Sequence, residues 1–188
     1  MTDRQLIEAY SARQDAHAFG VFVDRHQGAL LSFAAAFLRD DGLAQDVVQE
    51  TFMRAAQNPQ RILKCSAGAA SERNWLLKVT RDLSIDSLRK RATERRTVDK
   101  LATTPPENAP AADQRAEEQD EAACMHAAIE RLDPRLRELL ILKVREHKSY
   151  KEIAQIMGLS VTNVGFLLHQ AMQRLAEELR ARDERSAR

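Results

Sequence analysis

Cysteine, glycine, proline and aromatic residues are all scarce in this chain of 188 residues. The two cysteines, Cys65 and Cys124, lie far apart and form no CxxC pair, which argues against a disulfide framework or a zinc finger and for a reducing compartment. Six glycines and five prolines leave few of the residues that form β-turns. Disulfide-rich domains and mainly-β folds are therefore disfavoured.

The sequence also lacks long apolar runs. No stretch approaches the roughly 20 apolar residues that span a bilayer, and the first residues lack the basic-then-apolar pattern of a signal peptide. We therefore expect a cytoplasmic protein without membrane insertion. The formal net charge is only +1, so the chain as a whole is not a basic coat for nucleic acid, and the positions of its charges matter more.

What the chain has in quantity is helix-forming residues. Ala, Leu, Glu, Arg and Gln dominate, and hydrophobic residues make up 44% of the sequence, enough for a core. Hydrophobic residues recur at helical spacing from Thr2 to about Asn58, again from Ser71 to Leu88, and again beyond Asp120. The predicted fold class is all-α.

A segment without this spacing divides the chain. It holds a proline-rich stretch at 103–112 and an acidic stretch at 113–121, a composition typical of an extended, flexible connection. We predict two small helical domains, at residues 1–97 and 120–188, joined by a flexible Pro-rich acidic linker at residues 98–119. The free protein is expected to be a monomer.

Within the first domain, the pattern predicts a long helix that ends near Arg39 and a following helix that Asp41 caps. Residues 58–70 lose the periodicity and are expected to form a loop. A further helix begins at Ser71, and its apolar stripe comprises Trp75, Leu76, Val79, Leu83, Ile85 and Leu88. Because Trp75 lies on this stripe, a place in the core is favoured for it over stacking on a nucleic-acid base.

A run of positive charge follows this stripe. Its members are Arg89, Lys90, Arg91, Arg95 and Arg96, and Glu94 is the one acidic residue among them. Like charges this close together repel one another unless a partner neutralises them. The run therefore favours binding to a phosphate backbone over a merely solvated surface.

Residues 150–168 fit the pattern of a helix-turn-helix, in which the second helix enters the major groove of DNA. Ser149 and Glu152 fit a capping box, Gly158 stands where the chain must reverse with a positive φ, and Ser160 caps the second helix. The inner side carries Ile153, Ala154, Met157, Leu159, Val164 and Leu167. An ordinary helical hairpin is the alternative, because apolar spacing alone does not distinguish the two.

The outward face of the second helix is poor in positive charge. It carries Thr162, Asn163, Phe166, His169 and Gln170, and no Lys or Arg precedes Arg174. Phosphate contacts supply much of the affinity for DNA. The groups expected to make them are Lys148, Lys151, Arg174 and the helix N-terminus at Ser160. We expect this domain to bind DNA weakly by itself.

From about Ala18 to Glu178, the chain resembles the extracytoplasmic-function (ECF) sigma factors of bacterial RNA polymerase, a group of the sigma-70 family. The stretch AQDVVQETF at 44–52 looks like region 2.2, residues 74–90 are similar to regions 2.3 and 2.4, and residues 129–175 look like region 4. The resemblance implies an alternative sigma factor that directs RNA polymerase to specific promoters, without a cofactor or metal. The partners it implies are RNA polymerase core, promoter DNA and an anti-sigma factor.

The resemblance also implies roles for residues. Contacts with core polymerase are expected from Asp46, Gln49 and Glu50, with Val47 and Phe52 in the core. The residues expected along the minus-ten element are Asn74, Lys78, Arg81, Asp82, Asp86, Arg89 and Lys90, and the loop at 58–73 lies where the family captures a flipped base. Those expected at the minus-thirty-five element are Lys151, Ser160, Thr162, Asn163, Phe166, His169, Gln170 and Arg174.

The chain departs from the family pattern at a few positions. Gly165, Leu167 and Gln170 stand where the recognition helix is often basic, and Asp82 stands where Asn is common. A glycine inside a helix costs about 1 kcal/mol relative to alanine. Gly165 therefore either permits a close approach to DNA or marks weaker DNA reading, while Phe166 offers an apolar contact to a thymine methyl group or a sugar.

Three other classes of protein compete with this interpretation. An enzyme is disfavoured because the five histidines are scattered and no HExxH, phosphate-binding glycine loop or nucleophile elbow occurs. A sigma-like interaction protein that binds a regulator without recognising promoters would explain the uncharged recognition helix, but not Asp46, Gln49 or the basic run. A plain helix-turn-helix repressor would leave the first domain unexplained.

Overall fold

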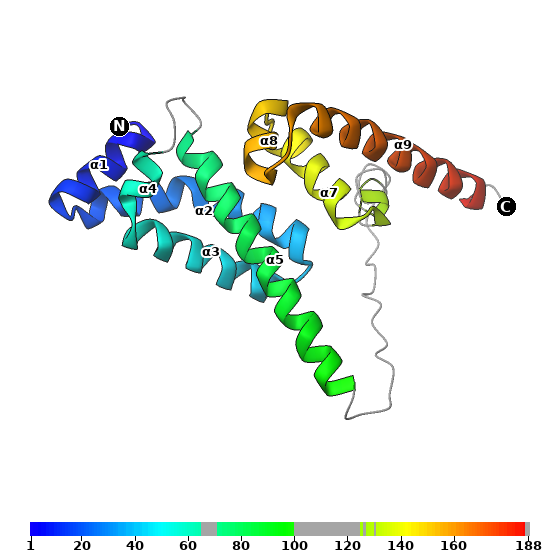
Figure 1. Cartoon of the computed structure of the whole chain (residues 1–188), viewed down its shortest axis with the longest axis horizontal. Coiled ribbons are helices and arrows are strands. Elements are labelled where there is room, and N and C mark those ends of the chain that lie inside the picture. The colour runs from blue at the N-terminus through cyan, green and yellow to red at the C-terminus, as the bar shows by residue number, and fades with distance from the viewer. Residues whose placement is uncertain (65–70, 100–124, 126, 130, 187–188) are drawn as a thin grey trace. The chain divides into compact units, whose positions relative to one another are not determined.

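The computed structural model describes residues 1–64, 71–99, 125, 127–129 and 131–186. None of these residues lies in a β-strand, and the chain divides into two compact units, Met1–Arg96 and Thr97–Arg188 (Figure 1). The predicted all-α fold with two helical domains is confirmed. The exact limits proposed for the domains stay a prediction, because residues 100–119 of the expected linker lie outside the described residues.

The first unit contains the helices α1 (Asp3–Arg13), α2 (Ala16–Leu38), α3 (Asp41–Gln57) and α4 (Pro59–Leu63), and nearly all of α5 (Ser71–Asp99). α2 packs against α1 and α3, and α4 also packs against both α1 and α3. The largest fully buried side chains of this unit are Leu6, Ile7, Phe22, Leu30, Phe33, Ile62, Leu76 and Leu77. The core of this unit is therefore built mainly from aliphatic residues, together with Phe22, Phe33, Phe37 and Phe52.

Capping chemistry sets the boundary between α2 and α3. α2 ends where Arg39 adopts a left-handed conformation with φ 56°, as predicted for its end. Oδ1 of Asp40 then accepts a hydrogen bond from the N–H of Leu43 at 2.9 Å. The prediction that Asp41 caps this helix is wrong: both aspartates have suitable side chains, but Asp41 is already the first helical residue.

The expected loop at residues 58–70 is wrong in its first part. Pro59–Leu63 form the short helix α4, with Pro59 in its first turn, where the missing N–H costs nothing. Ile62 is fully buried, so packing against the neighbouring helices stabilises a helix that its own sequence barely supports. Residues 65–70 lie outside the described residues.

The second unit contains α7 (Pro134–Leu140), the π-helical turn η1 (Ile141–Arg145), α8 (Tyr150–Met157) and α9 (Val161–Ser186). α7 and α8 both pack against α9. Asp133 caps α7, with Oδ1 accepting the N–H of Arg135 at 2.9 Å. α9 continues to Ser186, because no glycine or proline follows Leu175.

Candidate nucleic-acid and polymerase interfaces

α8 and α9 form the predicted helix-turn-helix. The capping box is present, since Glu152 accepts the N–H of Ser149 at 2.9 Å and Ser149 Oγ accepts the N–H of Glu152 at 3.3 Å. Gly158 adopts φ 66° at the turn, and Ser160 Oγ accepts the N–H of Asn163 at 3.2 Å. The local predictions at Ser149, Gly158 and Ser160 are therefore confirmed.

The inner side of α9 differs slightly from the prediction. Val164 is buried as expected, but the next buried residue is Leu168, whereas Leu167 is half-buried. A residue four positions further along a helix returns to nearly the same face, so Val164 and Leu168 point together into the core. Leu159, also predicted to be buried, is half-buried.

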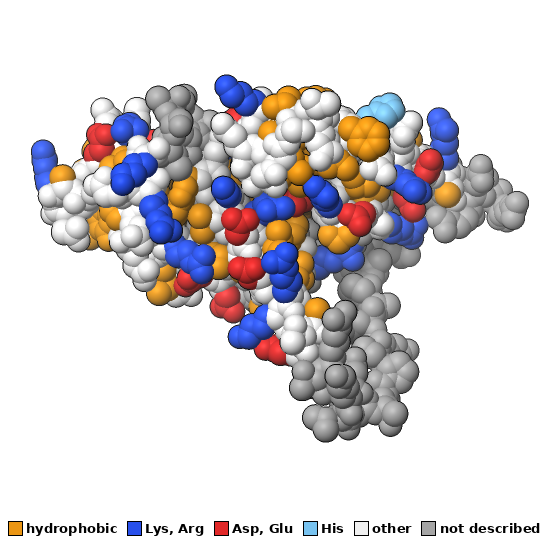
Figure 2. Space-filling view, in the orientation of Figure 1, with side chains coloured by type: hydrophobic (Ala, Val, Ile, Leu, Met, Phe, Trp, Pro, Cys, Tyr) orange, Lys and Arg blue, Asp and Glu red, His pale blue; other side chains and the backbone are white. Residues whose placement is uncertain are grey.

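The outward face of α9 presents uncharged side chains. Thr162, Asn163 and His169 are exposed, and Phe166 is 67% exposed. Gln170 is half-buried, because it lines with Arg174 a hollow of about 390 Å³ between the start of α7 and α9. In Figure 2, hydrophobic and uncharged side chains dominate the first half of α9. Base edges presented to this face would therefore meet amide, hydroxyl, imidazole and aromatic groups.

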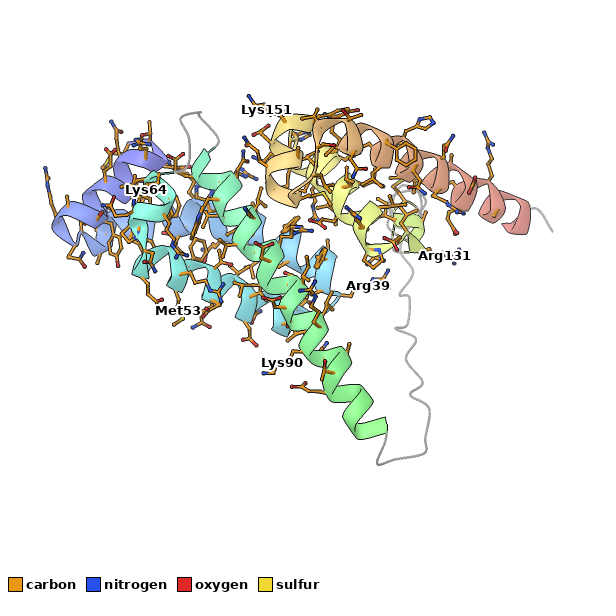
Figure 3. The ribbon with its side chains drawn as sticks, viewed as in Figure 1. Arg39, Met53, Lys64, Lys90, Arg131 and Lys151 are labelled. Carbon is orange, nitrogen blue, oxygen red and sulfur yellow. The ribbon has the colours of Figure 1, made fainter. Side chains whose placement is uncertain are left out.

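Few cations surround this face. Lys151 is exposed and points away from α8 (Figure 3). Arg174 is exposed, but its Nη1 lies 3.6 Å from Glu177. The expectation that Lys148 contacts phosphate is contradicted, because Lys148 is buried with its Nζ 3.8 Å from Glu152. Lys148, at the start of the helix-turn-helix, therefore has a structural role within the fold.

Gly165 lies beneath an aromatic ring from α8. A Cβ atom at this position would lie 3.7 Å from Cε2 of Tyr150, which is ordinary van der Waals contact. The ammonium group of Lys143 lies over the same Tyr150 ring, 5.2 Å from its centre. Tyr150 therefore packs where α8 and α9 meet, a role that its sequence position alone did not indicate.

The face that α5 buries differs from the predicted apolar stripe. Leu76, Leu77, Thr80 and Ser84 are fully buried, whereas Trp75, Val79, Leu83, Ile85 and Leu88 are half-buried. Thr80 Oγ1 lies 3.1 Å from Thr51 Oγ1 on α3, and Thr51 Oγ1 donates to the carbonyl of Val47 at 2.8 Å. Two small hydroxyl groups thus join α3 to α5, and Trp75 is not a core residue.

The residues predicted at the minus-ten element mostly reach the surface of α5. Lys78, Asp82, Asp86, Arg89 and Lys90 are exposed, while Asn74 and Arg81 are half-buried. Figure 2 shows that acidic and basic side chains lie beside one another over this helix. The exposed charge of α5 is therefore mixed in sign rather than uniformly basic.

The cations of α5 are of two kinds: some form ion pairs with acidic side chains and others do not. Arg81 pairs with Asp82 at 3.2 Å and Arg89 with Asp86 at 3.6 Å. Arg91 pairs with Asp40 at 2.8 Å. Among the side chains that the structure describes, no acid forms an ion pair with Lys78 or Lys90, and Lys90 points away from α5 (Figure 3). Among the described cations of α5, these two lysines are the most available to phosphate.

The Asp40–Arg91 pair also affects protonation. The pKa of Asp40 lies below its ordinary value, first because its carboxylate accepts the backbone N–H of Leu43 and then because Arg91 donates to it. Asp40 therefore stays ionised near neutral pH, and it holds Arg91 while capping α3. Arg91, one member of the predicted basic run, is thus paired with an acid of the protein itself.

The residues predicted to contact polymerase lie on α3. Asp46 and Gln49 are exposed and, three positions apart, lie on one side of the helix. Glu50 is half-buried and pairs with Arg54 at 2.8 Å. Val47 and Phe52 are buried, which confirms that prediction.

Beside Gln49 lies a shallow groove of about 430 Å³ between α2 and α3. Its lining is mostly apolar and comprises Phe19, Val23, Gln27, Leu31, Gln45, Val48, Gln49, Phe52, Met53 and Ala56. Met53 is 48% exposed and points outward (Figure 3). Sequence reasoning missed this groove; apolar residues at Val23, Leu31 and Met53, just off the core stripes, were the signal.

In the described part of the chain, no group of three or more His, Cys, Asp or Glu side chains is arranged to hold a metal ion. None of its helices has the length and apolarity needed to cross a lipid bilayer.

Two family models match the chain. The model of Sigma-70 region 2 matches residues 22–94, and that of Sigma-70, region 4 matches residues 122–175. The ECF RNA polymerase sigma factor SigM of Bacillus subtilis is 32% identical over 143 residues, which cover 76% of this chain and 83% of SigM. The chain belongs to the ECF sigma factors. It is therefore an alternative sigma factor, and an interaction protein that ignores promoters is not favoured.

Other relatives of this sigma factor agree. The RNA polymerase sigma-H factor of Pseudomonas aeruginosa is 29% identical over 187 residues, which cover 94% of this chain and 93% of that protein. The probable RNA polymerase sigma factor RfaY of Xanthomonas campestris pv. campestris is 28% identical over 174 residues, which cover 91% of this chain but only 42% of RfaY. Sigma factors are not enzymes in the catalytic sense.

Solved structures resemble this sigma factor as well. The sigma factor RpoE in complex with the anti-sigma factor NepR from Bartonella quintana has a TM-score of 0.66 at 25% identity, covering 86% of this chain and 96% of that one. CnrH in complex with the cytosolic domain of CnrY has a TM-score of 0.65 at 27% identity, covering 95% and 97%. The region 2 match spans most of α2 through most of α5, and the region 4 match includes the helix-turn-helix up to Leu175.

Proposed function

We propose that this sigma factor directs RNA polymerase to its promoters through three surfaces. Asp46, Gln49 and Glu50 on α3 would contact core polymerase. Residues of α5 would meet the minus-ten element: Asn74, Lys78, Arg81, Asp82, Asp86, Arg89 and Lys90. The helix-turn-helix would meet the minus-thirty-five element through Lys151, Ser160, Thr162, Asn163, Phe166, His169, Gln170 and Arg174. The proposal rests on one observation: most of these side chains are exposed, and they lie in the segments that match the Sigma-70 family models.

The arrangement of the chain is part of the proposal. The domains would comprise residues 1–97 and 120–188, and residues 98–119 would form the linker. We also propose an anti-sigma factor as a partner, which the complexes of RpoE with NepR support. A monomeric state and a cytoplasmic location complete the proposal.

The α3 surface is tested by measuring the affinity of the full chain for sigma-free core polymerase. Asp46→Ala and Gln49→Ala each remove an exposed polar side chain, and each is expected to weaken binding about fivefold, the value of one hydrogen bond. Gln57→Ala, also exposed on α3, serves as the matched control and should leave binding unchanged. Unchanged affinity in both Asp46→Ala and Gln49→Ala would move the polymerase contact elsewhere.

A further inference from the structure

The first turns of α9 lack charged residues of either sign. From Val161 to Gln173 the sequence contains no Lys, Arg, Asp or Glu. The exposed side chains of these turns include Thr162, Asn163, Phe166 and His169, which we name the reading face. Ser160 caps the helix directly before it. Whatever this face distinguishes, it does so without a formal charge.

Arg174 lies beyond the end of the reading face on α9. At a rise of about 1.5 Å per residue, it is about 8 Å past His169 and about 17 Å past Asn163 along the helix axis. The major groove is only about 12 Å wide. Arg174 is also held 3.6 Å from Glu177. Its guanidinium therefore suits the sugar-phosphate backbone better than a base edge.

The groups on the reading face match one kind of base pair. Guanine is read chiefly by Arg or Lys, and cytosine is read by Asp or Glu, which accept from its amino group. Neither kind of side chain is present in these turns. Asn163 offers the paired donor and acceptor that fit adenine, and Thr162 and Phe166 offer apolar groups that fit the methyl of thymine. His169 adds an imidazole ring, which lacks the parallel donor pair of Arg that fits guanine.

The exposure of Phe166 supports a contact outside the fold. Its side chain is 67% exposed, so it contributes little to the core of this unit. Met172 is also exposed, at 55%, but lies about 120° away around the helix. Phe166 is thus the large apolar group of the reading face, while Met172, about 120° from Phe166 around the helix, is a matched exposed residue.

We propose that α9 selects A·T base pairs in the minus-thirty-five element, with Phe166 packing on a thymine methyl group. This inference rests on the proposed function, since it requires that the helix-turn-helix meets promoter DNA. It specifies the class of base pair that this surface recognises.

The test uses the full chain with core polymerase and a promoter library with a randomised minus-thirty-five element. Transcribed members are expected to be enriched in A·T pairs, including one thymine that Phe166→Ala no longer selects. Replacing this thymine by uracil removes its methyl group, and should lower initiation by the wild type about fourfold, the factor for burial of one such group. The same replacement should leave Phe166→Ala unaffected, whereas Met172→Ala should respond like the wild type.

Phe166→Arg gives a second readout at an exposed site where folding is not at stake. The guanidinium should shift selection at the contacted position towards guanine. Enrichment of G·C pairs by the wild type, or equal responses to uracil in the wild type and Phe166→Ala, would overturn the inference while the sigma function stands. Failure of the wild type to initiate on any library member would overturn the proposed function, and this inference with it.

Discussion

Among single residues, His26 couples folding to pH. It is 4% exposed on α2, its Nε2 lies 2.8 Å from Oδ2 of Asp3 on α1, and its ring meets Phe22 edge-on. Burial lowers the pKa of His26 below its ordinary value, Asp3 opposes this shift, and the charges of Arg73 and Arg25 add to it. Arg25 also pairs with Asp3, so this contact ties α1 to α2.

The sign of the pH dependence follows from this lowered pKa. Below about pH 6.5 the unfolded chain binds more protons at His26 than the folded one, so the free energy of unfolding falls as pH falls. Urea unfolding at pH 7.5 and 5.5, followed by the fluorescence of Trp75, should show this loss in the wild type. His26→Gln should show less of it. Equal pH dependence in the two proteins would contradict the assignment.

Gly165 offers a second prediction at this scale. A Cβ there meets Tyr150 at an ordinary 3.7 Å, so Gly165→Ala should stabilise α9 by about 1 kcal/mol through helix propensity. Thermal unfolding followed by circular dichroism measures the change. Gly158→Ala is the contrasting control and should destabilise, because its φ of 66° disfavours a Cβ. A large loss of DNA binding in a stabilised Gly165→Ala protein would instead mean that DNA approaches the backbone there.

At the scale of helices, the contact between α3 and α5 depends on two buried hydroxyl groups. Thr51→Val and Thr80→Val each remove one side of a 3.1 Å hydrogen bond, and each should cost about 1 to 2 kcal/mol of stability. The double variant should lose about 1 kcal/mol less than the sum, as urea unfolding can measure. Thr93→Val, exposed on the same helix, is the control and should change stability little. Strict additivity would show that the hydroxyl groups act independently.

Interactions between residues close in the sequence could be predicted, whereas interactions between different helices could not. Ser149, Gly158 and Ser160 shape the backbone within a few residues of themselves, so their roles could be predicted from neighbouring residues. The buried position of Thr80 depends on a partner on another helix, which a single apolar pattern does not reveal.

Two further differences have the same cause. Lys148 is typical of a solvent-exposed cation by type, yet it is buried beside Glu152. Trp75 is typical of a core residue, yet the hydroxyl-bearing face of α5 turns inward instead and leaves it half-buried. The family resemblance correctly assigned the regions because three motifs in order constrain the fold more than any one helix pattern.

The cations of α5 yield a prediction about DNA binding. Lys90 is exposed and has no acidic partner among the described side chains, whereas Arg91 is held by Asp40. Lys90→Gln should therefore lower the slope of log affinity against log salt by about 0.7 to 0.9, the loss of one phosphate contact. Arg91→Gln should leave the slope nearly unchanged. The affinity of the reconstituted holoenzyme for promoter DNA at several salt concentrations measures both, and the opposite ranking would contradict this division of the cations.

At the scale of the whole molecule, the two units combine surfaces that are weak separately. The reading face has no cation, and several arginines of α5 are paired with acids. Binding to one large partner raises the effective concentration of each surface at the DNA, so weak contacts add without any new contact. Selectivity for promoters is therefore expected of the holoenzyme rather than of the isolated chain.

The most direct test of this account is transcription in vitro with the purified chain, sigma-free core polymerase and a pool of genomic promoters whose start sites are sequenced. The account predicts initiation at specific starts that share upstream motifs, and loss of that initiation in Asp46→Ala and Gln49→Ala. Binding to core polymerase without specific initiation, or no binding to core polymerase, would contradict it.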